Sequence, residues 1–218
     1  MASRTPVRLE KVRRMTMDIA VALDPGDACC LIFDWDGTLV DTRRANYLAL
    51  SETFADLGVG LDEHWYNQRT GLSTDSMIEA WLAECGLCSD VPVADLAKRR
   101  DEIFLRTAYT IRPVGPVLEV AQRYAGQLAM AVASGGSRGV IEPTMRKIGL
   151  NGLFDVLITR EDVARGKPDP QIFLLAAERL AILPALCLVY EDSDEGVRAA
   201  HAAGMPVVDV RPLLSERA

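Results

Sequence analysis

Short apolar runs that end abruptly in polar residues recur along the chain, and they predict its architecture. Runs at 29–33, 128–133, 154–159 and 187–190 have this form, and a fifth apolar run follows at 206–210. Runs this short and rich in Val, Ile and Leu are typical of buried strands in a parallel sheet. Helical patterns separate them at 138–148, 170–180 and 195–203. Strand alternating with helix predicts right-handed βαβ crossovers and an α/β fold with a doubly wound parallel sheet.

The spacing of the polar residues that follow these runs predicts an inserted domain. Ser134 and Lys167 are 33 positions apart, and Lys167 and Asp192 are 25 apart, which suits one βα unit each. Asp34 and Ser134, in contrast, are 100 positions apart. The surplus contains no convincing strand, but it has helical patterns at 43–57, 74–85 and 93–110. We therefore expect a small all-helical domain inserted after the first strand.

The domain boundaries follow from this reading. We expect a catalytic core made of residues 28–42 and 112–218, with the helical insertion at 43–111. Residues 1–27 are expected to form a loosely ordered N-terminal extension. The basic start of the chain superficially resembles a signal peptide, but Asp18 interrupts its apolar stretch and no small-residue cleavage site follows.

Composition narrows the classes of function. Apolar residues make up 49% of the 218-residue chain, which suits a globular protein with a real core. The formal net charge of −7 makes general binding to nucleic acid or to an anionic membrane a poor hypothesis. No apolar run reaches the roughly 18 to 20 residues that a membrane-spanning helix needs. Five cysteines, an odd number, argue against a disulfide framework and favour a reduced, cytoplasmic setting.

Candidate chemistry gathers where the predicted strands end. In an open parallel sheet, ligands bind beyond the carboxyl ends of the strands. Five polar side chains fall at such ends and one lies in a following loop: Asp34, Asp36, Ser134, Glu191, Asp192 and, in the loop, Lys167. Carboxylates this close together repel one another unless a cation holds them, and a purely oxygen ligand set favours Mg2+ over Zn2+. With a lysine and the amides of a Ser-Gly-Gly turn, such a site becomes a phosphate pocket.

Four motifs in order give the chain a resemblance to a known family. They are DWDGTLVDT from Asp34, VASGGS around Ser134, GKPDP around Lys167 and YEDSDEG around Glu191. Together they resemble the haloacid dehalogenase superfamily of phosphotransferases, over roughly residues 28–212, which implies a Rossmann-like core. The inserted helical segment is similar to the cap of the subgroup that contains β-phosphoglucomutase and the phosphoglycolate phosphatases. The stretch from FLLAAERL to AAGMPVVDVR is most similar to the branch that handles fructose 1-phosphate or 6-phosphogluconate.

The resemblance implies three catalytic roles. Asp34 would be the nucleophile that attacks phosphorus and forms an aspartyl-phosphate. Asp36 would protonate the leaving alcohol and then activate the water that breaks the intermediate. Lys167 would neutralise the charge that develops on Asp34 and the phosphate.

The resemblance also implies the binding groups. Ser134, Gly135 and Lys167 would hold the phosphoryl oxygens. The Mg2+ ligands would be Asp34, Asp36 through its backbone carbonyl, Asp192 and Glu191. In the insertion, four side chains are candidate substrate contacts: Arg43, Asn46, Arg69 and Thr74. The basic run 98–100 is expected to lie on a solvated face of a helix.

The function expected is a Mg2+-dependent phosphatase that acts on a small phosphorylated sugar or sugar acid. A β-phosphoglucomutase-type phosphotransferase is the alternative, against which two departures weigh. The mutase-like relatives carry His where this chain has Asn46, and Arg where it has Thr74. A non-catalytic protein that binds a phosphorylated metabolite is the remote alternative. The expected partner is a small phosphorylated metabolite, not nucleic acid or a membrane, and both a monomer and a homodimer stay open.

Overall fold

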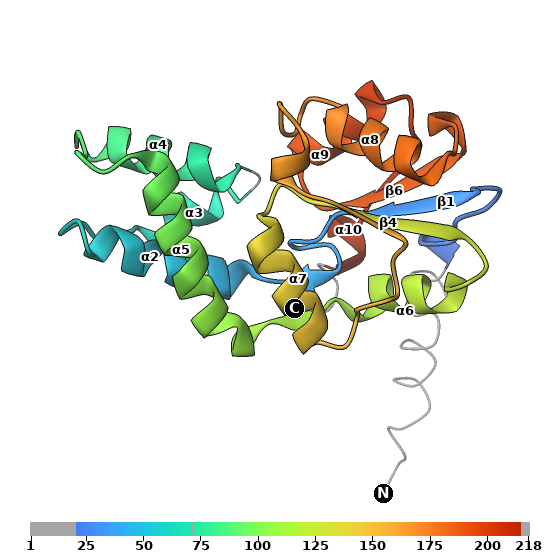
Figure 1. Ribbon diagram of the computed structural model, residues 1–218, viewed down its shortest axis with the longest axis horizontal. Coiled ribbons are helices and arrows are strands. Elements are labelled where there is room, and N and C mark those ends of the chain that lie inside the picture. The colour runs from blue at the N-terminus through green and yellow to red at the C-terminus, as the bar shows by residue number, and fades with distance from the viewer. Residues whose placement is uncertain (1–20, 71, 215–218) are drawn as a thin grey trace, which may run out of the picture.

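A five-stranded parallel sheet with helices packed on it forms the larger part of the described molecule, and a group of four further helices lies to one side (Figure 1). The computed structural model describes residues 21–70 and 72–214, with residue 214 described through its backbone alone. The strands are β1 (Cys30–Phe33), β4 (Ala129–Ala133), β5 (Val156–Ile158), β6 (Cys187–Glu191) and β7 (Val207–Asp209). All five lie within or overlap the apolar runs, so the predicted parallel sheet is confirmed.

The order of the strands brings three of the chain's motifs together. The sheet runs β5-β4-β1-β6-β7, so the first strand is central. The last residue of β1, Phe33, pairs in register with Val132 of β4 and Tyr190 of β6. The residues that follow β1, β4 and β6 therefore leave the sheet side by side at its carboxyl edge.

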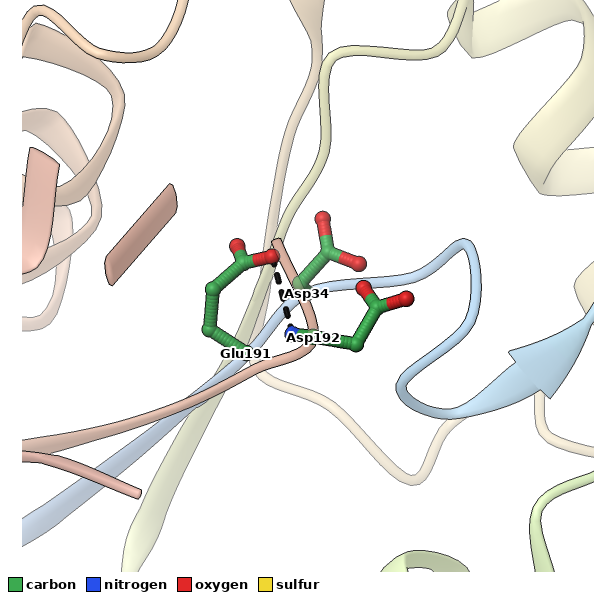
Figure 2. Close-up of side chains that lie close together, drawn as sticks. All are labelled: Asp34, Glu191 and Asp192. Atoms are coloured by element: carbon green, nitrogen blue, oxygen red, sulfur yellow. Dashed lines mark hydrogen bonds between the residues drawn. The ribbon is translucent and has the colours of Figure 1, made fainter. Parts of the chain in front are cut away.

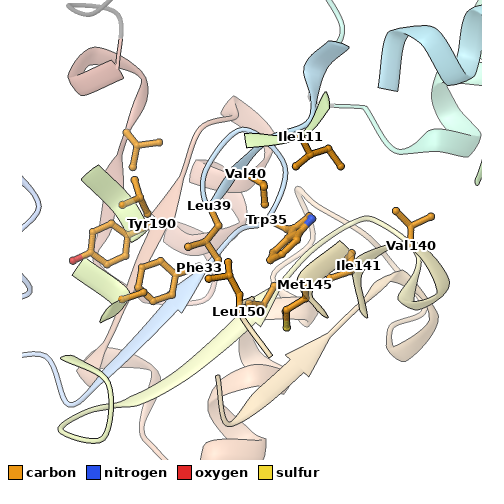
Figure 3. Close-up of a cluster of buried hydrophobic side chains, with 14 of the residues drawn as sticks. Phe33, Trp35, Leu39, Val40, Ile111, Val140, Ile141, Met145, Leu150 and Tyr190 are labelled. Atoms are coloured by element: carbon orange, nitrogen blue, oxygen red, sulfur yellow. The ribbon is translucent and has the colours of Figure 1, made fainter. Parts of the chain in front are cut away.

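Helices cover both faces of the sheet, because side chains alternate along each strand. Leu31 and Phe33 of β1 face a cluster with α6 (Gly115–Tyr124) and α7 (Arg138–Lys147), part of which is drawn in Figure 3. Cys30 and Ile32 face the opposite way, toward α8 (Gln171–Leu180) and α9 (Asp194–Ala202). The doubly wound α/β prediction is confirmed, although the sequence pattern did not single out α6.

Four helices make up the rest of the molecule, and we call them the helical insertion. They are α2 (Arg43–Ala55), α3 (Glu63–Asn67), α4 (Thr74–Glu84) and α5 (Val93–Thr107). Their own apolar core includes Phe54, Trp65, Trp81 and Leu96, so the insertion packs around a centre separate from the sheet. The short helix α3 was not predicted, since five residues are too few to show a helical period.

A two-residue ladder joins the insertion to the sheet. Strand β2 (Val40–Asp41) pairs antiparallel with β3 (Arg112–Pro113), so the chain enters and leaves the insertion at one place. Strands of two residues carry no period, and the sequence pattern therefore could not predict them. Three 3-10 turns, Ala108–Thr110, Arg160–Asp162 and Pro184–Leu186, and the final helix α10 (Arg211–Leu214) complete the described elements.

The predicted N-terminal extension is partly packed against the sheet. Residues 1–20 lie outside the part that the structure describes, but Leu23 is only 2% exposed. The hydroxyl of Tyr190, on β6, donates a 2.6 Å hydrogen bond to the carbonyl of Leu23. The packed core therefore begins before Ala28. Among the described residues, no helix combines the length and apolarity that a membrane span requires.

Replacing Leu23 by Ala should measure how much this packing contributes. The side chain is buried in the main apolar cluster, so truncation should lower the free energy of unfolding by about 3 kcal/mol. Val21→Ala is the matched control, because Val21 is 73% exposed and should change stability by less than about 0.5 kcal/mol. Urea denaturation followed by circular dichroism measures both, and equal stabilities would show that this segment does not contribute to the core.

Candidate active site

A cavity of about 490 Å3 lies at the carboxyl edge of the sheet, between the sheet and the helical insertion. Asp34, Ser134 and Lys167 line it from the sheet side. Asn46 of α2 and Arg100 of α5 line it from the insertion. The carboxyl edge, which the sequence predicts as the binding edge, thus faces a partly open cavity of the size that small ligands occupy.

Asp34 directly follows β1 and is nearly buried. Its backbone N–H donates to the carbonyl of Tyr190 at 3.0 Å, and the residue is 6% exposed. Burial, and then the negative charge of Glu191, raise the pKa of Asp34 well above its usual range, although the Lys167 ammonium opposes them. The carboxylate is therefore costly to keep ionised with the protein's own charges alone.

Lys167 reaches this carboxylate from the loop after β5. Its Nζ lies 2.6 Å from Oδ1 of Asp34 and 2.7 Å from Oε2 of Glu191, so one ammonium bridges two strand ends. Burial alone would lower the pKa of Lys167, but the two carboxylates outweigh burial and raise it above the ordinary value. The lysine is thus held protonated beside Asp34, as the sequence prediction requires.

Three carboxylates meet where β1 and β6 end (Figure 2). One oxygen each from Asp34, Glu191 and Asp192 all lie within 4.8 Å of one another. Burial, and then the charge of Glu191, raise the pKa of Asp192 to about 7. Lys167 supplies one positive charge to this cluster of three carboxylates, so negative charge remains. Mg2+ prefers oxygen ligands of this kind, and the residues present therefore fit this ion.

Glu191 is held more tightly than the other two acids. Its Oε1 accepts hydrogen bonds from the backbone N–H groups of Asp192 and Ser193 and from the hydroxyl of Ser193, at 2.9–3.0 Å. Its Oε2 accepts from Lys167. Asp192, by comparison, accepts one side-chain hydrogen bond, from Thr38 at 3.3 Å. Glu191 is therefore placed to fix Lys167, whereas Asp34 and Asp192 keep more of their capacity as ligands.

Two glycines make room for these carboxylates. Gly37 has a φ of +83°, and a Cβ built on it would overlap the Asp192 carboxylate. A Cβ on Gly196, in the first turn of α9, would overlap the carboxylate of Glu191. The sequence analysis did not single out Gly196, although its position five residues after the Glu191 motif residue is visible in YEDSDEG.

Asp36 lies on a tight turn between β1 and β2. The turn is closed by a 2.7 Å hydrogen bond from the N–H of Gly37 to the carbonyl of Val40. Oδ1 of Asp36 accepts from the Thr42 hydroxyl at 2.5 Å and from Nδ2 of Asn46 at 3.3 Å. Asp36 thus lines the same cavity as Asp34, and its carboxylate is oriented by residues at the start of the insertion.

The Ser-Gly-Gly turn lies opposite Asp36. Ser134 is 1% exposed at the end of β4, and its Oγ accepts from the N–H of Gly136 at 3.0 Å. A Cβ on Gly136 would lie 3.5 Å from Oδ2 of Asp36 and 3.3 Å from Oγ of Ser134. Ser134, Gly135 and Gly136 all line the cavity, so the predicted phosphate-binding turn faces the same space as Asp34 and Asp36.

The predicted substrate contacts of the insertion divide into two pairs. Asn46 and Thr74 line the cavity. Arg43 is exposed and is not among the lining residues, because it lies on the outer side of the first turn of α2. Arg69 stacks on Trp65, with 4.3 Å from its guanidinium carbon to the ring centre, and donates to the Trp65 carbonyl at 3.1 Å. Arg43 and Arg69 are thus not brought to the site in this structure.

The expectation of a solvated basic face at 98–100 is wrong for Arg100. Lys98 is exposed, but Arg100 is 7% exposed and lines the cavity. A signal was present in the sequence, because Arg100 continues the helical stripe formed by Leu96, Ala97, Ile103 and Phe104, which are all buried. Arg160, which also lines the cavity, was not singled out.

The chain has relatives among known proteins. The family of haloacid dehalogenase-like hydrolases matches residues 31–210. The chain is 32% identical to the fructose-1-phosphate phosphatase YqaB of Escherichia coli (strain K12), over 84% of this chain and 96% of that protein. It is 34% identical to the protein CbbY of Rhodobacter capsulatus, over 82% of this chain and 83% of that protein.

Solved structures agree with these relatives. The crystal structure of CbbY from Rhodobacter sphaeroides in complex with phosphate superposes with a TM-score of 0.75 at 27% identity, covering 83% of this chain and 84% of that chain. The family match, the relatives and the fold all span the sheet together with the insertion. The chain therefore belongs to the haloacid dehalogenase-like hydrolase family and is a hydrolase of phosphate esters.

Proposed function

We propose that this hydrolase is a Mg2+-dependent phosphatase that cleaves a phosphorylated sugar or sugar acid through an aspartyl-phosphate on Asp34. The observation that carries the proposal is the contact of Asp34 with Lys167 in the cavity at the carboxyl edge of the sheet. A buried carboxylate beside a lysine, with a second acid on the next turn, suits nucleophilic attack on phosphorus better than a structural ion pair.

The proposed reaction has two steps. An oxygen of Asp34 attacks phosphorus in line and forms the acyl phosphate, while the bond from phosphorus to the leaving oxygen breaks. Asp36 gives its proton to that oxygen, and the alcohol departs. Asp36 then takes a proton from water, whose oxygen attacks the same phosphorus and releases phosphate and free Asp34. Lys167 offsets negative charge in both steps, and the Ser134–Gly136 turn binds phosphoryl oxygens.

The metal would be held by the acidic cluster at the ends of β1 and β6. Asp34 and Asp192 offer carboxylate oxygens, Asp36 offers its backbone carbonyl, and Glu191 completes the charge of the site. Mg2+ bound there would neutralise charge on the phosphoryl oxygens.

The size and walls of the cavity support a small substrate. A space of about 490 Å3 closed on one side by helices suits a phosphorylated metabolite and excludes a folded phosphoprotein. The likeness to the fructose-1-phosphate phosphatase supports a phosphorylated carbohydrate. We place the enzyme in the reducing cytoplasm, which is supported by the five unpaired thiols of Cys29, Cys30, Cys85, Cys88 and Cys187.

The phosphoglucomutase alternative is less well supported. Asn46 and Thr74, which replace the His and Arg of the mutase-like relatives, both line the cavity. The cavity therefore lacks, at those two positions, the cationic groups that would retain a bisphosphate intermediate between half-reactions. A phosphatase transfers the phosphoryl group to water and has no bisphosphate intermediate to retain.

Asp34→Asn should abolish turnover while phosphate binding survives. Loss of the nucleophile should lower kcat by about 10⁴-fold or more, because the remaining groups bind but cannot form the acyl phosphate. Phosphate release is measured from a panel of hexose phosphates, phosphoglycolate and 6-phosphogluconate, with Mg2+ and then with EDTA.

The control variant is Asp27→Asn, at an exposed carboxylate outside the cavity, which should keep full activity. Persistent turnover in Asp34→Asn would refute the aspartyl-phosphate route. If the unaltered chain released no phosphate but converted β-glucose 1-phosphate to glucose 6-phosphate with a bisphosphate primer, the mutase alternative would hold instead.

Gly196→Ala should lower kcat by about 100-fold and lower the free energy of unfolding by about 1–3 kcal/mol. The added methyl overlaps the Glu191 carboxylate, so Glu191 must move and can no longer hold Lys167 against Asp34. Alanine nevertheless has the higher helix propensity, which offsets part of the strain.

Gly139→Ala is the matched control for this variant. Gly139 is also a helical glycine, but a Cβ there meets nothing within 4 Å. Activity and the unfolding temperature are measured for both variants. Unchanged kcat in Gly196→Ala would show that Glu191 does not position Lys167.

Mg2+ affinity should fall as the pH is lowered. Because burial and Glu191 raise the pKa of Asp192 to about 7, this carboxyl is largely protonated at pH 6 and must lose its proton to bind the ion. At pH 8 it is already ionised, so the affinity should be about tenfold higher there. Calorimetric titration with Mg2+ in two buffers of different ionisation heat measures both the affinity and the proton released. Equal affinities at pH 6 and pH 8 would contradict the assignment of Asp192 as a ligand.

A further inference from the structure

Two arginines form a second polar region in the cavity that the proposed reaction does not use. Arg100 projects from α5 of the insertion, and Arg160 begins the 3-10 turn after β5. The side chains of Arg100 and Arg160 are 8% and 26% exposed. Neither makes an ion pair with Asp34, Glu191 or Asp192 among the contacts of the described residues.

The half-buried carboxylate of Asp101 lies between the two guanidinium groups. Oδ1 of Asp101 is 2.8 Å from Nη1 of Arg100, and Oδ2 is 3.3 Å from Nη2 of Arg160. Oδ2 also accepts from the Ser137 hydroxyl at 2.5 Å. Two guanidinium groups thus share the one carboxylate beside them that is largely shielded from water, so the water-excluded part of this wall keeps a positive excess.

Each guanidinium also retains an unused donor. Nε of Arg100 and Nη1 of Arg160 are buried and have no hydrogen-bond partner within the described chain. Two other carboxylates lie near Arg160: Asp75 is 3.6 Å from Nη1 and Glu161 is 3.7 Å from Nε. Their side chains are 53% and 48% exposed, so solvent screens both pairs. Because buried N–H groups without an acceptor are costly, the arrangement calls for an acceptor that enters from the cavity.

Packing holds Arg100 in place without using up its donors. Its guanidinium carbon lies 4.8 Å from the ring centre of Phe104, so the side chain is supported by an aromatic face on the same helix. A guanidinium fixed in this way offers paired donors to a planar or tetrahedral anion at small entropic cost.

We infer that Arg100 and Arg160 form a subsite for a second anionic group of the substrate. This inference rests on the proposed phosphatase function and narrows the substrate to phosphate monoesters that carry a carboxylate or a second phosphate. The scissile phosphoryl group lies at Asp34 and Lys167, and the second anion takes the free donors of the two arginines. Asp101 belongs to the subsite as the group that orients both guanidiniums.

The test compares substrates that share a phosphate and differ in the second charge. 6-Phosphogluconate is set against glucose 6-phosphate for a carboxylate, and fructose 1,6-bisphosphate against fructose 1-phosphate for a second phosphate. The unaltered chain should prefer the member with the second anion in at least one pair by about tenfold in kcat/KM. The pair that shows the larger preference identifies which anion the subsite takes.

Arg100→Met and Arg160→Met should each lower the ratio of kcat/KM for the doubly charged substrate to that for the singly charged one by about tenfold. The loss should fall on the doubly charged substrate, while kcat/KM for the singly charged one changes little. Arg100→Lys, which keeps the charge and is the safer variant for folding, should lose part of the preference. Arg99→Met is the matched control, since Arg99 neighbours Arg100 on α5 but pairs with Asp56 outside the cavity and should leave the preference intact.

Two results would overturn the inference. The first is equal preference for both members of each pair by the unaltered chain. The second is an equal loss on both members in the arginine variants, which would mean that the arginines only join the insertion to the sheet through Asp101.

Binding to the Asp34→Asn variant separates this inference from the proposed function. Calorimetric affinity for 6-phosphogluconate and for fructose 1,6-bisphosphate is compared in that background with and without Arg100→Met. If no substrate is turned over, the phosphatase proposal fails, yet a tenfold loss of affinity in the double variant would still support the subsite. Unchanged affinity there would refute the subsite whether or not the enzyme is active.

Discussion

The rest of the site depends on one interaction, the ion pairing of the Lys167 ammonium with two buried carboxylates from neighbouring strands. Asp34 follows β1 and Glu191 ends β6, and the parallel register of these strands brings the two acids to one point. Without a cation between them, their charges would repel in a place that water hardly reaches. The sheet order, the loop after β5 and the glycines beside the acids all serve to make this contact possible.

The fold and the floor of the site could be predicted because each rests on a local pattern. A run such as CLIF followed by Asp is readable as a buried strand with an acid at its end, whatever the rest of the chain does. Asp34, Ser134 and Asp192 were found in this way. Arg100 could have been found from its place in an apolar helical stripe, but a run of three basic residues obscured that signal.

The residues that line the cavity from the insertion and from the loops could not be predicted from local sequence patterns. Arg43 and Asn46 lie three residues apart on one helix, yet only Asn46 lines the cavity, because the facing of α2 depends on how this helix packs against α5. Arg160 had no pattern around it that distinguished it from an ordinary loop arginine. The two-residue strands β2 and β3 are stabilised by each other and by the turn after β1, and these are tertiary contacts.

The hydrogen bonds to Asp36 come from the insertion side of the chain, so the orientation of this carboxylate is tied to the position of helix α2. Thr42 is the N-cap residue of α2 and Asn46 lies in its first turn, so both donors to the Asp36 carboxylate travel with that helix. A displacement of α2 away from the sheet would remove these donors from Asp36 at the same moment as it admits bulk water. In the proposed reaction, the orientation of the proton-transferring carboxyl would therefore depend on the position of one helix of the insertion.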